Sequence, residues 1–345
     1  MSNSIFSATV RSFFVCFAAV MGILLGMFVL IIAIGAASGS SDTSPQISYK
    51  YSPEILPNGN GVRKILSSSS PVILTIDIKG VIGLDGLTQE KIAQQLIESR
   101  EGDFTGDRVK AILLDIDTPG GTSSDADAIY RAIKAYKETH NTPVYAFIDG
   151  YCASGGVYIA SAADKIYSTE ASLIGSVGVI MSSALNFSQL MDKIGVQSLT
   201  LYEGKGKDNL NPLRPWVKGE EDNIKDAIDY FYQLFVNIVT QNRPNLSKQK
   251  LIDVYGANVY PATLAKEYGY IDESGVSRQE TLKQLTAAIG EEDDQVQVVR
   301  MESTNWLSEL FKTSNPLLQG KITHQVDIPL EMRFGSHPQV LYLYR

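Results

Sequence analysis

Three short runs of mostly apolar, often β-branched residues constrain the fold more than any other feature of this sequence. They are PVILTIDIKG (71–80), VKAILLDID (109–117) and TPVYAFIDG (142–150). Helical patterns separate them, at 87–100 and at 123–140. Strands that are apolar on both faces and alternate with helices are typical of parallel β-α-β units. The sequence therefore predicts an α/β domain built on a parallel sheet.

The remaining elements follow from shorter patterns. After 150 we expect strands at 164–169, within 171–180 and at 196–204, a helix near 188–195, a long helix at 220–243, a short helix, turn and strand within 263–275, and a terminal strand at 338–345. A polar loop rich in Gly, Lys, Asn and Pro occupies 204–215. No internal repeat is found, so the domain is predicted to occur once.

An uncharged apolar run at 13–37 precedes the domain. As a helix it would be about 37 Å long, which is enough to cross a bilayer. We therefore expect a transmembrane anchor, with a cleaved signal peptide as the alternative because small residues at 35–37 offer a cleavage site. Arg11 is the only charged residue before the run, which favours a cytoplasmic tail at 1–12 and an extracytoplasmic domain.

Composition narrows the function classes. The net charge is −8, with 30 Lys and Arg against 38 Asp and Glu, and the sequence has no long basic run. Nucleic acid is therefore not an expected partner. The Ser-, Gly- and Pro-rich segment 38–70 is predicted to be a flexible linker, 71–290 the main domain, and 291–345 a C-terminal extension with the terminal strand.

Ser154 is the first residue that could carry chemistry. The stretch DGYCASGG joins the end of a buried strand to the start of a helix. A serine there would meet unpaired N–H groups of the helix N-terminus, and its small neighbours leave room for a substrate carbonyl. The alternative interpretations are an ordinary helix cap by Ser154 and a thiol nucleophile at Cys152, although a cysteine leaving a strand is normally packed inside.

A second candidate is the turn DTPGG, residues 117–121, at the exit of another buried strand. Paired glycines after a proline can direct backbone N–H groups outward, which suits an oxyanion. The alternative is a plain strand-to-helix turn, with Thr122 or Ser123 capping the next helix.

A serine nucleophile also needs a base. The three histidines, His140, His324 and His337, lie in a polar turn and in the C-terminal tail, so a Ser-His-Asp arrangement finds no obvious imidazole. A lysine that acts as a base must lose its charge near neutral pH. Lys205 and Lys207 in YEGKGKDN are the candidates, since each would disfavour the charge of the other.

The order of these signals is more specific than any one of them. The chain resembles the signal peptide peptidase A or protease IV family of bacterial Ser-Lys peptidases in four segments. In chain order they are DTPGG, YCASGGVYIASAADKIYSTEASLIGSVGVI, EGKGKDNLNPLRPW and YPATLAKEYGYIDE. The resemblance covers roughly 70–290 in its single-length form, with 149–180 as the most specific part. It implies a Clp-protease/crotonase-like α/β fold and makes 71–290 a serine peptidase domain.

The resemblance also implies roles for single residues. Ser154 matches the family nucleophile, and Lys207 matches the general base, with Lys205 as the lesser candidate. Backbone N–H groups of Gly120 or Gly121, together with Gly155, would form the oxyanion hole. The chain departs from the family where Glu203 replaces a frequent Ser and Asp117 replaces the usual Asn; we expect a structural role for Asp117.

Function follows as an expectation. The resemblance implies a homo-oligomeric endopeptidase, single-pass in the bacterial inner membrane with its catalytic domain on the periplasmic side. It would cleave hydrophobic peptides such as residual signal peptides, with no metal, no cofactor, and a dyad that adjacent protomers can share. The alternatives are a crotonase-like acyl-CoA enzyme and an inactive membrane-bound scaffold of the same fold.

Overall fold

The computed structural model describes residues 11, 13–23, 25–27, 29–30, 51–84, 86–303 and 340–343. The chain divides into two compact units, 1–48 and 49–345. In the first unit the described residues between 11 and 30 are helical. Within the described ranges, no helix combines the length and the apolar composition needed to cross a membrane. Residues 31–37 of the predicted anchor lie outside those ranges.

A mostly parallel sheet organises the second unit. Its order is β1 (Tyr51–Ile55), β11 (Gln297–Ser303), β2 (Val72–Lys79), β3 (Val109–Thr118), β5 (Val144–Ala153), β6 (Lys165–Ser168) and β10 (Glu273–Ser274). Only β1 runs antiparallel to its neighbour along this path. The end of β5 also pairs with β7 (Leu173–Gly175), which pairs with β9 (Val259–Pro261). The predicted α/β fold with a parallel sheet is thus confirmed.

A small second sheet lies at the exit of β3. It consists of β4 (Gly120–Thr122), β12 (Val340–Leu343) and β8 (Ile180–Met181), with β12 in the middle. Both pairings of β12 are antiparallel. The C-terminal strand therefore lies directly against the DTPGG turn.

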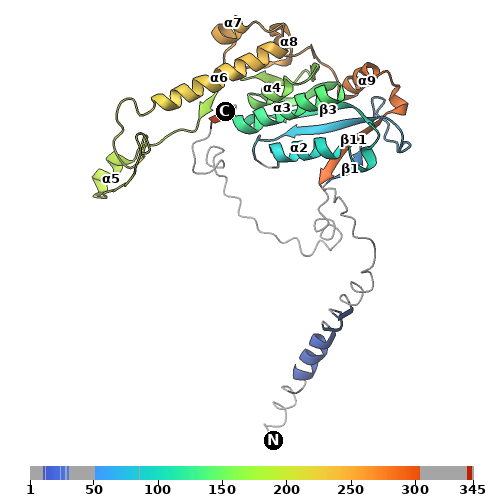
Figure 1. Cartoon of the computed structure of the whole chain (residues 1–345), viewed down its shortest axis with the longest axis horizontal. Coiled ribbons are helices and arrows are strands. Elements are labelled where there is room, and N and C mark those ends of the chain that lie inside the picture. The colour runs from blue at the N-terminus through green and yellow to red at the C-terminus, as the bar shows by residue number, and fades with distance from the viewer. Residues whose placement is uncertain are drawn as a thin grey trace. The chain divides into compact units, whose positions relative to one another are not determined.

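Helices cover the two faces of the main sheet unequally (Figure 1). The larger core packs α2 (Gln89–Glu98), α3 (Ser123–His140), α4 (Gly155–Ala160) and α6 (Asp222–Asn242) against one face, and α9 (Arg278–Ala288) covers the other. The alternation in β3 explains this, since Leu114 faces the larger core and Leu113 the smaller one.

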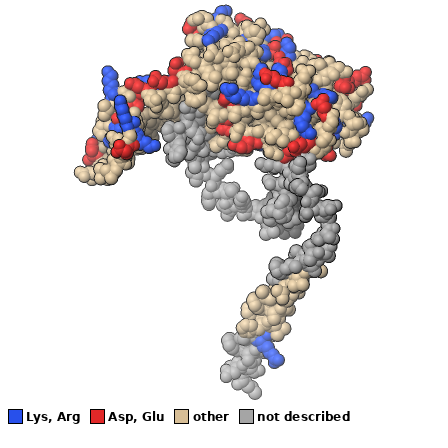
Figure 2. Space-filling model, in the orientation of Figure 1, with Lys and Arg blue, Asp and Glu red and all other residues tan. Residues whose placement is uncertain are grey.

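The other helical elements are short. They are α5 (Ser188–Ile194), α7 (Lys248–Lys250), α8 (Ala262–Tyr268), the 3-10 turns Gly102–Phe104 and Asp293–Gln295, and one π-helical turn, Leu251–Tyr255. On the face seen in Figure 2, positive and negative side chains are interspersed over the second unit.

Two predicted boundaries differ from the structure. Residues 51–55 of the predicted linker form β1, and the side chain of Gln297 holds the backbone of Lys64 and Leu66 through two hydrogen bonds. At the other end, β11 belongs to the main sheet and lies between β1 and β2, so the sheet continues past residue 290. β1 is an edge strand with one partner, so its sequence, YSPEI, can be largely polar. Such a sequence gives no strand signal.

The predicted strand at 196–204 is wrong. These residues form no strand and lie in a long excursion, residues 182–221, which we call the arm. Figure 1 shows α5 at the far end of the arm, away from the sheet and its helices. Leu199 and Leu201 are each 85% exposed. Their alternating pattern has no partner strand in the described part of the chain.

Candidate active site

Ser154 stands in a strained turn where β5 ends and α4 begins. Its backbone has φ 53° and ψ −114°, a positive φ that a serine rarely adopts. Two backbone hydrogen bonds hold the turn: the Ser154 N–H donates to the carbonyl oxygen of Gly175 in β7 at 2.8 Å, and the Tyr158 N–H donates to the Ser154 carbonyl at 3.2 Å. Sharp strand-to-helix turns of this kind present nucleophiles in α/β hydrolases.

The Ser154 side chain does not cap α4. The helix has no side-chain hydrogen bond at its N-cap, so the capping interpretation is wrong. Its hydroxyl oxygen is buried and has no hydrogen-bond partner among the described residues. Because an unpaired buried hydroxyl and a positive φ both cost free energy, their coincidence at one serine is typical of a functional site.

A two-residue slip between β3 and β5 creates the turn. Ile116 pairs with Ile148, whereas Thr118 pairs with Cys152, so β5 carries extra residues opposite Asp117. The Asp117 carboxylate accepts a hydrogen bond from the Tyr151 N–H at 2.9 Å and replaces the missing strand partner. This gives Asp117 the structural role that the sequence predicts.

Glycine is required inside this slip. Gly150 has φ +123°, and a Cβ there would lie 2.4 Å from the Asp117 carboxylate oxygen. The DTPGG turn and the Ser154 turn also touch, since a Cβ at Gly156 would lie 2.7 Å from the Thr118 methyl group. The two candidate segments are therefore adjacent.

The two glycines of the DTPGG turn have different environments. The Gly120 N–H donates to the Thr118 hydroxyl at 3.1 Å. Gly121 packs so closely on the preceding chain that a Cβ would lie 1.9 Å from the Ile82 carbonyl oxygen. Of the predicted oxyanion donors, the Gly120 N–H thus already has an acceptor.

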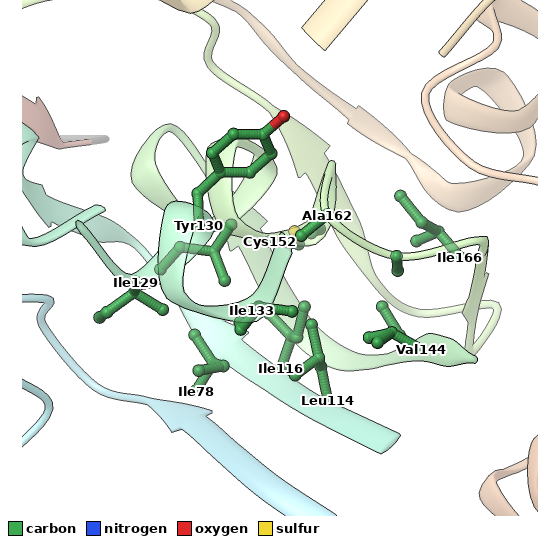
Figure 3. Close-up of a cluster of buried hydrophobic side chains, with 14 of the residues drawn as sticks. Ile78, Leu114, Ile116, Ile129, Tyr130, Ile133, Val144, Cys152, Ala162 and Ile166 are labelled. Atoms are coloured by element: carbon green, nitrogen blue, oxygen red, sulfur yellow. The ribbon is translucent and has the colours of Figure 1, made fainter. Parts of the chain in front are cut away.

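Cys152 is not a nucleophile in this environment. Its side chain is 1% exposed and lies among apolar groups of the larger core (Figure 3). Burial raises the pKa of the thiol far above its ordinary value, so the reactive thiolate does not form near neutral pH.

The structure does not bring the predicted base to Ser154 within one chain. Lys205 and Lys207 lie in the arm, where both are exposed, while Ser154 is buried. Neither ammonium group has a hydrogen bond or ion pair to any described residue. The side chains of the nucleophile and of the candidate base therefore both lack partners within the described part of the chain.

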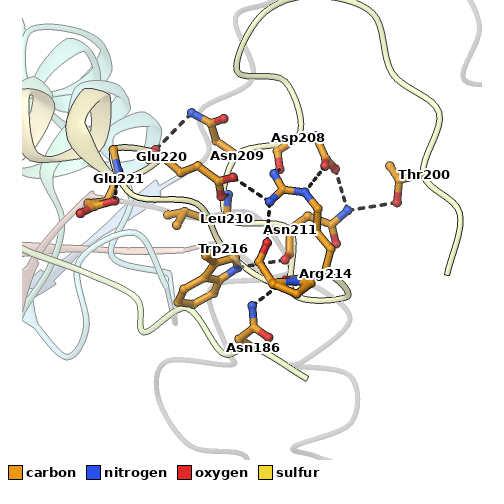
Figure 4. A network of polar contacts seen from close by, with 12 residues as sticks. Asn186, Thr200, Asp208, Asn209, Leu210, Asn211, Arg214, Trp216, Glu220 and Glu221 are labelled. Carbon is orange, nitrogen blue, oxygen red and sulfur yellow. Dashed lines mark hydrogen bonds and ion pairs between the residues drawn. The ribbon is translucent and has the colours of Figure 1, made fainter. Parts of the chain in front are cut away.

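The sequence analysis missed a network of polar contacts that stabilises the loop 204–215, which carries Lys205 and Lys207 (Figure 4). Arg214 contacts the Asp208 carboxylate through Nε at 2.5 Å and the Glu220 carboxylate through Nη1 at 2.6 Å. Asn211 donates a further bond to Asp208 at 2.6 Å. These contacts lower the pKa of Asp208 and of Glu220, with the Arg214 hydrogen bond as the main cause for each. The carboxylate next to Lys207 is thereby engaged by Arg214.

The other candidate groups stand apart. His140 ends α3, where its ring packs on Tyr136 and burial lowers its pKa. His324 and His337 lie outside the described residues. The described residues also contain no group of three or more His, Cys, Asp or Glu that could hold a metal ion.

Comparison with known proteins identifies the family. The model named Peptidase family S49 matches residues 137–289, which include Ser154 and Lys207. A protease from Synechocystis sp. is 32% identical over 243 residues, which are 68% of this chain and 84% of that protein. The chain belongs to peptidase family S49. This confirms the resemblance and makes the protein a serine peptidase.

Other similarities of this S49 peptidase extend over much of the chain. An Enterococcus faecium protein named as signal peptide peptidase SppA is 27% identical over 286 residues, covering 80% of this chain and 82% of that protein. Among solved structures, a ClpP1 mutant from Listeria monocytogenes has a TM-score of 0.40 at 18% identity, covering 60% of this chain and 93% of that one.

Proposed function

We propose that this S49 peptidase is a membrane-anchored endopeptidase that uses Ser154 and Lys207 to cleave hydrophobic peptides such as residual signal peptides. The observation that carries the proposal is the buried hydroxyl of Ser154, held without a partner in a strained turn. The name of the Enterococcus relative supports the substrate class. The apolar run at 13–37 supports a single-pass anchor in the bacterial inner membrane, with the catalytic domain on the periplasmic side.

The chemistry assigns one task to each group. Neutral Lys207 takes the proton of the Ser154 hydroxyl as the oxygen attacks the peptide carbonyl. Backbone N–H groups of Gly121 and Gly155 stabilise the oxyanion, because the Gly120 N–H is engaged by Thr118. Water then releases the acyl-enzyme. Activity should rise with pH, since the base acts only when uncharged.

We further propose that the dyad is completed between copies of the chain in a homo-oligomer. Lys207 lies exposed on the arm, and among the described residues neither its ammonium group nor the Ser154 hydroxyl has a hydrogen-bond or ion-pair partner. Apolar side chains on the arm, including Leu199, Leu201 and Val217, are exposed. Exposed apolar patches of this kind mark protein contacts.

A Clp-protease/crotonase-like fold is part of the same proposal and is supported by the parallel sheet with Ser154 at the end of β5.

Mixing two inactive variants tests the proposal. Full-length Ser154→Ala and Lys207→Ala are assayed on a hydrophobic peptide, separately and after mixing, with Lys205→Ala as the matched control. We expect both variants to lose at least about a hundredfold in kcat and the mixture to recover activity. Full activity of Lys207→Ala would refute the base assignment. A dead mixture, despite subunit exchange shown by labelled copies, would refute the shared dyad.

The two rival functions give different results. A crotonase-like enzyme would transform acyl-CoA esters even as Ser154→Ala, because that chemistry needs no serine. An inactive scaffold would show no covalent labelling at Ser154 by a serine-reactive phosphonate.

A further inference from the structure

The helix that follows the nucleophile, α4, is too short to be stable by itself. It has six residues, with Ser154 at its N-cap and the proposed oxyanion donor Gly155 in its first turn. Isolated helices of this length do not form in water, because one or two backbone hydrogen bonds do not offset the cost of nucleation. Contacts with the rest of the domain must therefore set the position of α4 and its rotation about its own axis.

Apolar packing constrains that rotation only weakly. All six residues of α4, GGVYIA, are buried. Hydrophobic burial is non-directional, and a helix that is buried all round has no polar face to fix which side points inward. Two of the six residues are glycines, which have no side chain to interlock with neighbours. A directional contact is needed, and Tyr158 is the only residue of α4 with a polar side chain.

Tyr158 makes a directional contact with α3. Its side chain is fully buried, and its hydroxyl donates a hydrogen bond to Oδ1 of Asp127 at 2.6 Å. The other oxygen of Asp127 accepts a hydrogen bond from Nε of Arg131, one turn along α3, also at 2.6 Å. Hydrogen bonds to a carboxylate are short and strong, and Arg131 restrains the carboxylate that receives this one.

The ring and the backbone of Tyr158 extend the connection in both directions. The ring packs edge-on against Tyr130 of α3, with centroids 5.5 Å apart, and in a tilted arrangement against Phe235 of α6 at 5.2 Å. The backbone N–H donates to the carbonyl oxygen of Ser154 at 3.2 Å. One residue thus connects two long helices to the backbone of the nucleophile.

We propose that Tyr158 and Asp127 are positioning residues, which fix the rotation of α4 and thereby direct the Gly155 N–H towards the oxyanion. The inference rests on the proposed function, in which Ser154 attacks and Gly155 helps to stabilise the oxyanion. Oxyanion donors act at short range and stabilise the transition state more than the bound substrate. Loss of the contact between Tyr158 and Asp127 should therefore lower kcat and leave KM nearly unchanged.

Two matched tyrosine variants of the full-length chain test the inference. Tyr158→Phe removes the hydroxyl and keeps the ring. The control, Tyr130→Phe, removes the hydroxyl of the neighbouring ring, which accepts a hydrogen bond from Asn242 at 2.9 Å. Each variant loses one hydrogen bond, so both should melt about 2 °C below wild type.

Their steady-state kinetics on a hydrophobic peptide should differ. We expect Tyr158→Phe to lower kcat about tenfold, because small displacements in an active site are costly, with KM within about twofold of wild type. Tyr130→Phe should keep both kcat and KM within about twofold. Equal kcat values for the two variants would overturn the inference, since a purely structural role predicts the same effect for both.

Variants of Asp127 test the partner. Asp127→Asn keeps a side chain that can form a hydrogen bond with the tyrosine hydroxyl, so it should retain kcat within about twofold. Asp127→Ala should match Tyr158→Phe, and the double variant should be no slower than either single variant, because both remove the same contact. Losses that multiply in the double variant would overturn the pairing.

Hydrogen exchange separates this inference from the proposed function. The amide of residue 158, which donates to the Ser154 carbonyl, should exchange at least about fivefold faster in Tyr158→Phe than in Tyr130→Phe. Equal exchange would overturn the anchoring of α4. If wild type hydrolyses no peptide and a serine-reactive phosphonate does not label Ser154, the proposed function fails and the catalytic part of the inference with it. The exchange data still decide whether the Tyr158 hydroxyl holds α4.

Discussion

At the scale of single residues, the candidate site depends on contacts between segments far apart in sequence. Ser154 is held by Gly175 through a backbone hydrogen bond, and the preceding slip in β5 is held by the carboxylate of Asp117. Asp117 is exposed and contributes little to the core. Its contact with Tyr151 nevertheless fixes how far β5 runs before it turns, and hence where the serine hydroxyl stands.

Asp117 should therefore affect catalysis more than stability. Asp117→Ala removes the acceptor for the Tyr151 N–H, which we expect to lower kcat on the order of tenfold while KM stays nearly unchanged, because small displacements of a nucleophile are costly. The free energy of unfolding should fall by only about 1 kcal/mol.

The control is Asp117→Asn, which keeps an acceptor oxygen at the same position. It should retain activity within about twofold. Steady-state kinetics and urea unfolding measure both effects. An equal loss of kcat in the asparagine variant would show that the charge of Asp117 matters, and not its hydrogen bond.

At the scale of elements, the arm is a structured excursion that has no core of its own. Arg214 joins Asp208 and Glu220, and Trp216 donates a hydrogen bond to the Asn211 carbonyl at 2.9 Å. Charge pairing and backbone hydrogen bonds thus stabilise the loop that carries Lys207. Because these ion pairs hold only while Asp208 and Glu220 are ionised, the arm should respond to acid more than the sheet does.

Acid should loosen the arm. The pKa values of Asp208 and Glu220 are lowered in the folded arm, so their contribution to stability is complete above the ordinary carboxylate pKa values of about 4 and is lost as pH falls below them. In a Trp306→Phe background, the fluorescence of Trp216 should report this transition.

Arg214→Gln provides the comparison for that titration. We expect its Trp216 emission to be shifted already at neutral pH and to change little on acidification, because both carboxylates have lost their partner. A titration curve identical to that of the parent would exclude the network as the source of the pH dependence.

Elements with a buried periodic pattern could be predicted from sequence, and others could not. β2, β3, β5 and α3 lie where their apolar runs indicate. The alternation at 196–204 is that of a half-buried strand, yet no described neighbour pairs with it. For the candidate site, the sequence could predict that Ser154 lies between a strand and a helix. The contact of Asp117 with Tyr151 could not be predicted, because it depends on the slip between β3 and β5, which no local sequence pattern encodes.

At the scale of the whole molecule, one domain must satisfy two requirements, a close-packed sheet and a nucleophile turn that packing does not favour. Ser154 combines a positive φ with a buried hydroxyl that has no partner among the described residues. A residue in such a backbone conformation costs about 1–3 kcal/mol. The surrounding core, with β5 paired on both sides, supplies the rigidity that keeps it there.

That backbone strain should lower the melting temperature of the enzyme by a measurable amount. Ser154→Gly removes both the backbone strain and the buried hydroxyl, whereas Ser154→Ala removes only the hydroxyl. Neither variant retains a nucleophile. After allowing for the greater freedom of glycine in the unfolded chain, the glycine variant should melt about 2–4 °C above the alanine variant in calorimetry. A lower melting temperature for Ser154→Gly would mean that the turn is unstrained. With the expected order, the backbone angle that presents the nucleophile would itself lower thermal stability, a trade-off between durability and turnover fixed at one residue.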